Sequence, residues 1–138
     1  MKTISSQDLN ECLKYTYSNS IASSEYASFI RYLIMTMKKE MAIEVLNNED
    51  DTVIKGQIFN FNIEYREGAE GEHDNINFSL KNNNLDEEQF TYSLMNIGKE
   101  QVSKDSKSSP KTFYRFYLYP ESNEEGYRIT FNRRVTKK

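Results

Sequence analysis

Apolar and polar residues alternate along two segments near the C-terminal end of the sequence. Residues 111–119 and 127–134 are rich in Phe, Tyr and Arg, and a polar stretch containing one glycine separates them. Because successive side chains of a strand point to opposite faces of a sheet, this pattern predicts a β-hairpin. The apolar face of the predicted hairpin consists of Tyr114, Phe116, Leu118, Tyr127, Ile129 and Phe131.

The opposite face of this hairpin combines arginines with aromatic side chains, and we name it the Arg/Tyr face. Guanidinium groups bind phosphates, and flat side chains stack on nucleic-acid bases. The same residue types are enriched in protein interfaces, whereas an antiparallel sheet can also leave such a face in solvent. A protein contact, a nucleic-acid contact and an ordinary solvated face therefore all remain open. The candidate partner-binding residues are Phe113, Arg115, Tyr117, Tyr119, Arg128, Asn132 and Arg134.

Helical spacing of apolar residues characterises the N-terminal third of the chain. Ser5 can cap a helix, an acidic residue follows three positions later, and a polar run after Tyr17 interrupts the pattern. These features predict a short helix over about residues 6–18. Its buried stripe consists of Leu9, Cys12, Leu13 and Tyr17.

A second and longer apolar stripe follows. Ser23 or Ser24 can cap its start, and Glu25 suits the positive N-terminal end of a helix. The pattern allows this helix to continue through Val45 and to stop at Asn47. Its stripe consists of Tyr26, Phe29, Ile30, Leu33, Ile34, Met37 and Met41.

Apolar and polar residues also alternate in the middle of the chain, and this pattern predicts a second hairpin. A strand is expected over about residues 53–66, and another around residues 76–80, with an acidic, glycine-containing loop between them. Gly56 is expected to mark a bulge or an entry bend in the first of these strands. The apolar faces consist of Phe59, Phe61, Ile63 and Tyr65 on the first strand, and Ile76, Phe78 and Leu80 on the second.

Residues 84–98 fit two different structures. Asn84 can cap a helix and Gly98 can end it, and the apolar residues between them share one helical face. The segment also contains many strand-forming residues. We favour the helix, and we expect a loop rich in Ser and Lys over residues 99–110.

Together these elements predict an α+β fold in a single domain spanning residues 1–138. Two N-terminal helices, within about residues 6–46, pack on one face of a four- to five-stranded antiparallel sheet within about residues 53–135. An extra helix is expected at about residues 85–97. The expected core joins Phe59, Phe61, Ile63, Phe78, Leu80, Phe116, Ile129 and Phe131 of the sheet to Phe29, Ile30, Leu33, Ile34 and Met37 of the second helix.

Composition narrows the class of protein. No apolar run approaches the length of a membrane span, and the first residues lack the apolar segment of a secretory signal, so we expect a cytoplasmic protein without membrane contact. Cys12 is the single cysteine, which excludes an internal disulfide and a zinc site built from several cysteines. We expect it to be a buried core residue.

The net charge of −3 conceals an asymmetry between the two parts of the chain. Residues 1–98 carry 8 Lys and Arg against 16 Asp and Glu, a net charge of −8, whereas residues 99–138 carry 10 against 5, a net charge of +5. Such a distribution favours a charged partner or head-to-tail self-association, although charge in solvated loops explains it equally well.

Catalytic and metal-binding patterns are weak in this sequence. His73 lies among Glu67, Glu70, Glu72 and Asp74, but the spacing matches no EF-hand loop, and we expect a solvated turn that binds no metal. The sequence contains no P-loop, no Gly-x-Ser-x-Gly motif and no dinucleotide fingerprint, so we expect no cofactor.

These observations favour a small cytosolic, non-enzymatic binding protein that acts by occupying a macromolecular partner, most readily another protein. Inhibitors, immunity proteins and phage anti-defence factors act in this way. The alternative is a nucleic-acid-binding accessory protein that uses the Arg/Tyr face, although the overall acidity of the chain disfavours it. A small enzyme without a recognisable motif is the third hypothesis.

Overall fold

A computed structural model describes residues 2–18, 21–47, 49, 51–66, 68, 74–104, 111–118 and 126–131, and the side chains of all of these except residues 100–104, 111–114 and 131. The elements within these residues are β1 (Lys2–Ser5), α1 (Leu9–Thr16), α2 (Glu25–Lys38), β2 (Ala42–Leu46), β3 (Thr52–Tyr65), β4 (Asn75–Lys81), β5 (Glu87–Ser93), the 3₁₀ turn η1 (Leu94–Asn96), β6 (Ile97–Lys104), β7 (Lys111–Leu118) and β8 (Tyr127–Phe131).

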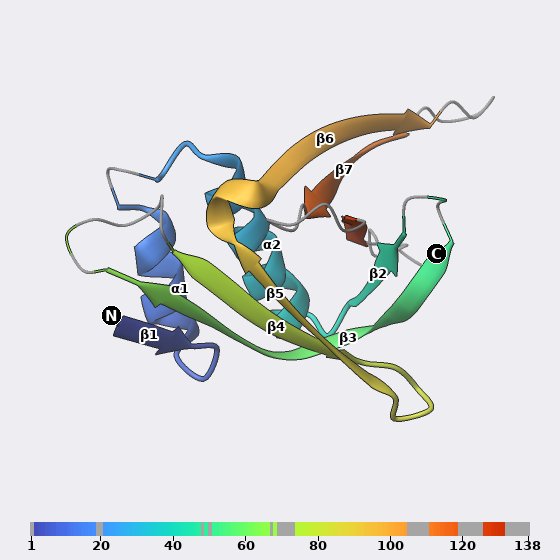
Figure 1. The fold of residues 1–138 in the computed structure, drawn as a ribbon, viewed down its shortest axis with the longest axis horizontal. Helices are drawn as coiled ribbons and strands as arrows, with labels where there is room; N and C mark the ends of the chain where they lie inside the picture. The colour runs from blue at the N-terminus through green and yellow to red at the C-terminus, as the bar shows by residue number, and fades with distance from the viewer. Residues whose placement is uncertain are drawn as a thin grey trace.

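The strands form one antiparallel sheet in the order β5-β4-β3-β2-β8-β7-β6, and β1 pairs with the far end of β3. This arrangement confirms the predicted α+β fold with helices packed on an antiparallel sheet, but the described sheet has eight strands rather than four or five. The two outermost strands, β5 and β6, follow each other directly in sequence through η1. The sheet is therefore strongly curved, and Figure 1 shows α2 lying inside the curve.

Helix α2 supplies the centre of the core. Its residue Phe29 contacts Phe78 on β4 and Phe116 on β7, with ring centroids 5.8 and 5.2 Å apart. One side chain thus bridges two strands that lie far apart in the sheet order. Leu33, on the same stripe, is completely buried, which confirms the predicted packing face of this helix. At the start of α2 the Ser24 hydroxyl accepts a hydrogen bond from the Ala27 amide, as a capping serine does.

The prediction that α2 continues through Val45 is wrong. The helix ends at Lys38, Glu40 adopts a left-handed backbone with φ of 53°, and residues 42–46 form β2. Ile43 and Val45 are buried with the period of two that belongs to a strand. Pairing of β2 with both β3 and β8 overrides the helical spacing of this segment.

Helix α1 is shorter than expected and is capped differently. It begins at Leu9, and the Asp8 carboxylate accepts a hydrogen bond from the Glu11 amide, whereas the residues around Ser5 belong to β1. Cys12 is buried as predicted. Tyr17 follows the last helical residue and is 61% exposed, so its expected place in the buried stripe is wrong, and Tyr15 is buried in the core instead.

A β-bulge changes the predicted core of β3. Ile58 pairs with Leu80 and Asn60 pairs with the preceding residue of β4, so Phe59 has no partner of its own. The extra residue reverses the alternation: Ile58 and Phe61 are both buried, whereas Phe59 is 39% exposed. Phe59 is therefore not a core residue, contrary to the prediction.

Gly56 has a role other than the predicted bulge or bend. A Cβ atom at this position would lie 2.4 Å from the backbone oxygen of Lys81, so the glycine permits a close approach of β3 and β4.

The two predicted hairpins, β3–β4 and β7–β8, are both present and antiparallel.

The helix expected at residues 85–97 is absent, and the segment forms β5, η1 and the first residue of β6. Phe90 and Tyr92 are buried at alternate positions, and β5 pairs with β4 along seven residues. The strand propensity noted in the sequence therefore prevails because β4 offers a complete pairing edge. Within the expected loop at residues 99–110, residues up to Lys104 belong to β6, and the remainder lies outside the described residues.

Candidate functional site: the Arg/Tyr face

The β7–β8 hairpin separates an apolar face from the Arg/Tyr face as the sequence predicts. Phe116 pairs with Ile129, and both side chains are completely buried in the core. The next pair along the hairpin, Tyr117 with Arg128, therefore lies on the opposite face of the sheet, and so does the pair of Arg115 with Thr130.

Three of the predicted binding residues can be placed on this face with their side chains. Arg115, Tyr117 and Arg128 are each half-buried, so they are not freely solvated strand residues. Phe113 lies on β7 two residues before Arg115, and its side chain is outside the described set. Tyr119, Asn132 and Arg134 lie outside the described residues.

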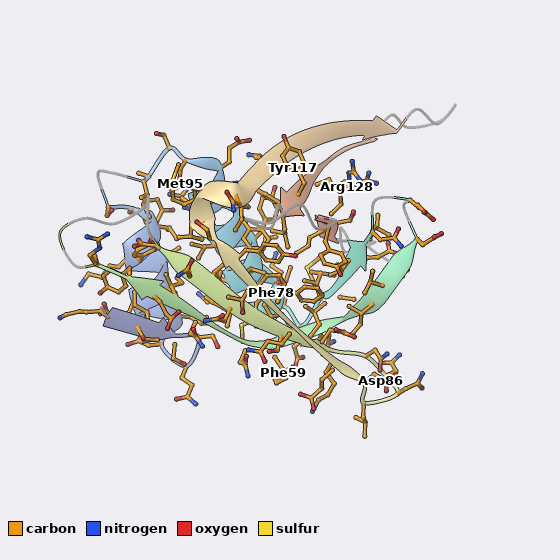
Figure 2. All side chains as sticks on the ribbon, viewed as in Figure 1. Phe59, Phe78, Asp86, Met95, Tyr117 and Arg128 are labelled. Atoms are coloured by element: carbon orange, nitrogen blue, oxygen red, sulfur yellow. The ribbon has the colours of Figure 1, made fainter. Side chains whose placement is uncertain are left out.

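Tyr117 occupies a defined position between two neighbouring strands. It pairs with Gly98 of β6 on one side and with Arg128 of β8 on the other. A Cβ atom at Gly98 would lie 2.1 Å from Cε2 of the tyrosine, so the ring covers the glycine. An aromatic ring laid over a strand glycine is a known way to stabilise a sheet. In Figure 2 the side chains of Tyr117 and Arg128 lie close together on this part of the molecule.

Strand β2 extends the face with residues that the sequence analysis did not include. Glu44 pairs with Thr130, and Leu46 pairs with Arg128. The Glu44 carboxylate accepts a hydrogen bond from the Thr52 hydroxyl of β3. Leu46 is 8% exposed, and strand alternation places it on the face opposite its core neighbour Val45. These residues could have been found only if residues 42–46 had been identified as a strand.

The extended face is therefore chemically mixed. Guanidinium groups on β7 and β8 lie in the same part of the sheet as a carboxylate on β2 and a buried leucine. The hydroxyl oxygen of Thr130 is buried, and it has no hydrogen-bond partner among the described residues. A buried polar atom that makes no hydrogen bond lowers the stability of the folded state.

Cys12 does not have the properties of a nucleophile. Its thiol is completely buried, and its Sγ donates to the Ser5 carbonyl oxygen over 3.4 Å. Burial, with a smaller contribution from the nearby Asp8 carboxylate, raises the pKa of the thiol to about 12. The thiolate that nucleophilic chemistry requires is therefore scarce at neutral pH.

The acidic loop around His73 contains one residue that the sequence analysis misjudged. Asp74 is completely buried and accepts a hydrogen bond from the Tyr15 hydroxyl, so it is not part of a solvated turn. His73 and the glutamates at positions 67, 70 and 72 lie outside the described residues. Among the residues that the structure describes, no group of three or more His, Cys, Asp or Glu could hold a metal ion.

The described helices are also too short or too polar to cross a lipid bilayer. Comparison of the chain with protein-family models, with curated proteins and with solved structures finds no match in any of the three.

Proposed function

We propose that this protein is a small, non-enzymatic binding protein that acts in the cytoplasm by occupying a protein partner through the Arg/Tyr face. The observation that carries the proposal is the arrangement of Tyr117 over Gly98 and beside Arg128. Tyrosine and arginine dominate the energetics of protein interfaces because they combine large contact areas with hydrogen-bonding groups.

The placement of the three side chains on paired strands supports this proposal. Arg115, Tyr117 and Arg128 project from paired strands and are already half-buried. Side chains that are held in place before binding lose less conformational entropy when a partner docks. When a partner docks on this face, less of the contact free energy is therefore offset by the ordering of these side chains.

The charge pattern favours a protein over a nucleic acid. Glu44 lies between Thr130 of β8 and Lys55 of β3 on the same face, so this face carries charges of both signs, which suits the uniformly negative backbone of a nucleic acid poorly. A protein partner can place its own cations against Glu44 and its carboxylates against Arg115 and Arg128. Charged groups across a protein interface are arranged so that opposite charges meet, which gives the contact its specificity.

The test is the double variant Arg115→Ala/Arg128→Ala, measured against a partner captured from the native host. Truncation of central interface arginines often costs about 2 kcal/mol or more, so we expect affinity to fall by about thirtyfold or more. The matched control is Lys14→Ala/Arg66→Ala, which removes two cations from other parts of the chain and should leave affinity unchanged. Circular dichroism verifies that both variants are folded.

A second variant separates the position of the tyrosine ring from the charge of the face. Gly98→Ala retains both arginines but places a methyl group where the Tyr117 ring lies. We expect it to weaken binding by displacing the ring. Parental affinity in both the double arginine variant and Gly98→Ala would contradict the proposal.

Binding to single-stranded RNA, measured by fluorescence polarisation at two salt concentrations, tests the nucleic-acid alternative. Tight binding that falls steeply with salt and disappears in the double arginine variant would replace the protein partner with a nucleic acid.

A further inference from the structure

Phe59 is an exposed aromatic side chain that the backbone directs toward solvent. The β-bulge in β3 places it outside the core, and the Lys81 ammonium lies 5.1 Å from the centre of its ring. Bulges are over-represented at functional sites because they redirect individual side chains. In a regular strand Phe59 would share a face with Phe61 and Ile63, which are buried.

Leu85 is a second exposed apolar residue, and an irregular backbone also presents it. It is 73% exposed, and its φ of 65° lies in the left-handed region that bulky residues rarely adopt. The turn that carries it is closed by the Asn82 side-chain oxygen, which accepts hydrogen bonds from the amides of Asn84 and Asp86 at 2.9 and 3.0 Å. This hydrogen-bonded turn presents Leu85 to solvent.

The two residues belong to the same end of the molecule. Phe59 contacts Lys81, and Lys81 is followed directly by Asn82, which organises the turn containing Leu85. The close approach at Gly56 holds β3 against the backbone of Lys81 and Asn82. Figure 2 shows Phe59 and Asp86 on the side of the molecule away from Tyr117 and Arg128. We name the set Phe59, Lys81, Leu85, Asp86 and Glu87 the Phe59/Leu85 corner.

Charges of both signs flank the apolar residues of this corner, and they lie on two neighbouring strands. Lys81 of β4 pairs with Glu87 of β5, so the cation lies toward β3 and the carboxylate toward the edge of the sheet. Asp86, in the turn before β5, adds to the acidic side, so the corner has a cationic half at Lys81 and an acidic half at Asp86 and Glu87. A ligand with charges of one sign would be repelled by one half.

We propose that the Phe59/Leu85 corner is a self-association surface, and that its occupant is a second copy of this chain related by a two-fold axis. A two-fold rotation brings the cationic half of one copy onto the acidic half of the other, and it brings the apolar residues together. Two-fold interfaces require self-complementarity of this kind, and they are the commonest in homo-oligomers. This surface is independent of the Arg/Tyr face.

Sedimentation velocity of the full chain, from micromolar to submillimolar concentration, tests the proposal. We expect the mass to rise toward that of a dimer, and the association to weaken with added salt because exposed charges contribute to it. Phe59→Ser and Leu85→Ser should each lower the association constant about tenfold or more. The control is Met95→Ser, because Met95 is 57% exposed but lies on η1, away from the corner.

A charge-reversal experiment tests the symmetry directly. K81E and E87K should each dimerise more weakly than the parent, because each places like charges across the axis. An equimolar mixture of the two variants should recover the association, since the mixed pair has opposite charges at both contacts. Arg115→Ala/Arg128→Ala should dimerise like the parent.

The proposal would be overturned by a parent that stays monomeric throughout, by parental association in Phe59→Ser and Leu85→Ser, or by a mixture that associates no better than either reversed variant alone. Loss of dimerisation in the double arginine variant would also overturn it, because the contact would then lie on the Arg/Tyr face.

Discussion

Burial changes the acid–base chemistry of the Cys12 thiol. The thiol lies between α1 and β1, where it is shielded from solvent and faces the Ser5 carbonyl oxygen. In such surroundings the neutral thiol is favoured over the thiolate, and the pKa rises from 9.0 to about 12. A cysteine of this kind packs as a small apolar side chain.

The raised pKa of Cys12 makes stability depend on pH in a predictable direction. The unfolded chain releases the thiol proton near pH 9.0, whereas the folded chain retains it up to about pH 12. The free energy of unfolding should therefore fall as pH rises between these values, with Cys12 contributing at most about 1.4 kcal/mol per pH unit. Urea unfolding at pH values below and above 9.0, in the parent and in Cys12→Ala, measures how much Cys12 contributes to the pH dependence of the free energy of unfolding. Equal pH slopes in the two proteins would show that the thiol is not shielded.

Alternation predicted individual core residues only where the strand is regular. Phe61 and Phe116 were assigned correctly because the alternation is regular around each of them, in β3 after its bulge and in β7. Phe59 was assigned wrongly because an inserted residue is visible only in the pairing with β4, which local sequence does not encode. The contact of Tyr117 with Gly98 likewise joins β6 to β7, and neither residue alone indicates it.

At the scale of elements, Arg31 of α2 holds the end of α1 and the connection between the two helices. Its guanidinium donates to the Thr16 hydroxyl at 3.1 Å, to the Thr16 carbonyl at 2.7 Å and to the Ala22 carbonyl at 3.0 Å. The ring of Tyr17 lies 4.3 Å from the guanidinium carbon. The last carbonyl groups of a helix carry partial negative charge and no intrahelical donor, so the half-buried Arg31 cation stabilises the end of α1.

Arg31→Ala should therefore destabilise the helical layer. Hydrogen bonds to charged groups contribute about 1.5–3 kcal/mol each. Because water replaces some of the three hydrogen bonds that Arg31 donates, we expect the free energy of unfolding to fall by about 2–4 kcal/mol, which is less than their sum. Arg31→Lys should recover only part of this loss, since an ammonium group cannot reproduce the planar fork. Amide hydrogen exchange should show a larger loss of protection in α1 than in β4. Equal losses in the two elements would contradict this local role.

Element types were predictable where one periodicity was clear over a long segment, as in α2. They were not predictable at residues 42–46 and 87–93, which are short and whose apolar residues also fit a helix. In both segments the deciding factor is pairing with a neighbouring strand: residues 42–46 pair with β8 from far along the chain, and residues 87–93 pair with the preceding strand β4. The Glu44 part of the Arg/Tyr face was missed for the same reason.

At the scale of the molecule, Asp74 joins parts of the chain that are distant in sequence. Its side chain accepts hydrogen bonds from the Tyr15 hydroxyl of α1 and from the Arg66 amide at the end of β3. Its carbonyl oxygen accepts a hydrogen bond from the Leu94 amide of η1 at 2.9 Å. The Tyr15 ring also packs edge-on against Tyr65, with centroids 5.2 Å apart. This cluster fixes α1 to one end of the sheet.

Removal of the hydroxyl alone, in Tyr15→Phe, should lower the free energy of unfolding by about 1–3 kcal/mol, because a buried carboxylate loses a donor. The same substitution should cost much less in an Asp74→Ala background. Urea unfolding of the four proteins in this double-mutant cycle gives the coupling. Additive effects would show that the two side chains do not depend on each other.

The place of β2 between β3 and β8 has a consequence for biosynthesis. β2 ends at Leu46 and β8 begins at Tyr127, so roughly 80 residues lie between these neighbouring strands. At about 5–20 residues per second, the ribosome needs about 4–16 s to deliver β8 after β2 has emerged. During that interval one edge of β2 is uncovered in the nascent chain, and an uncovered edge is a template for aggregation. The yield of folded protein should therefore depend on translation speed and on chaperones that shield this edge.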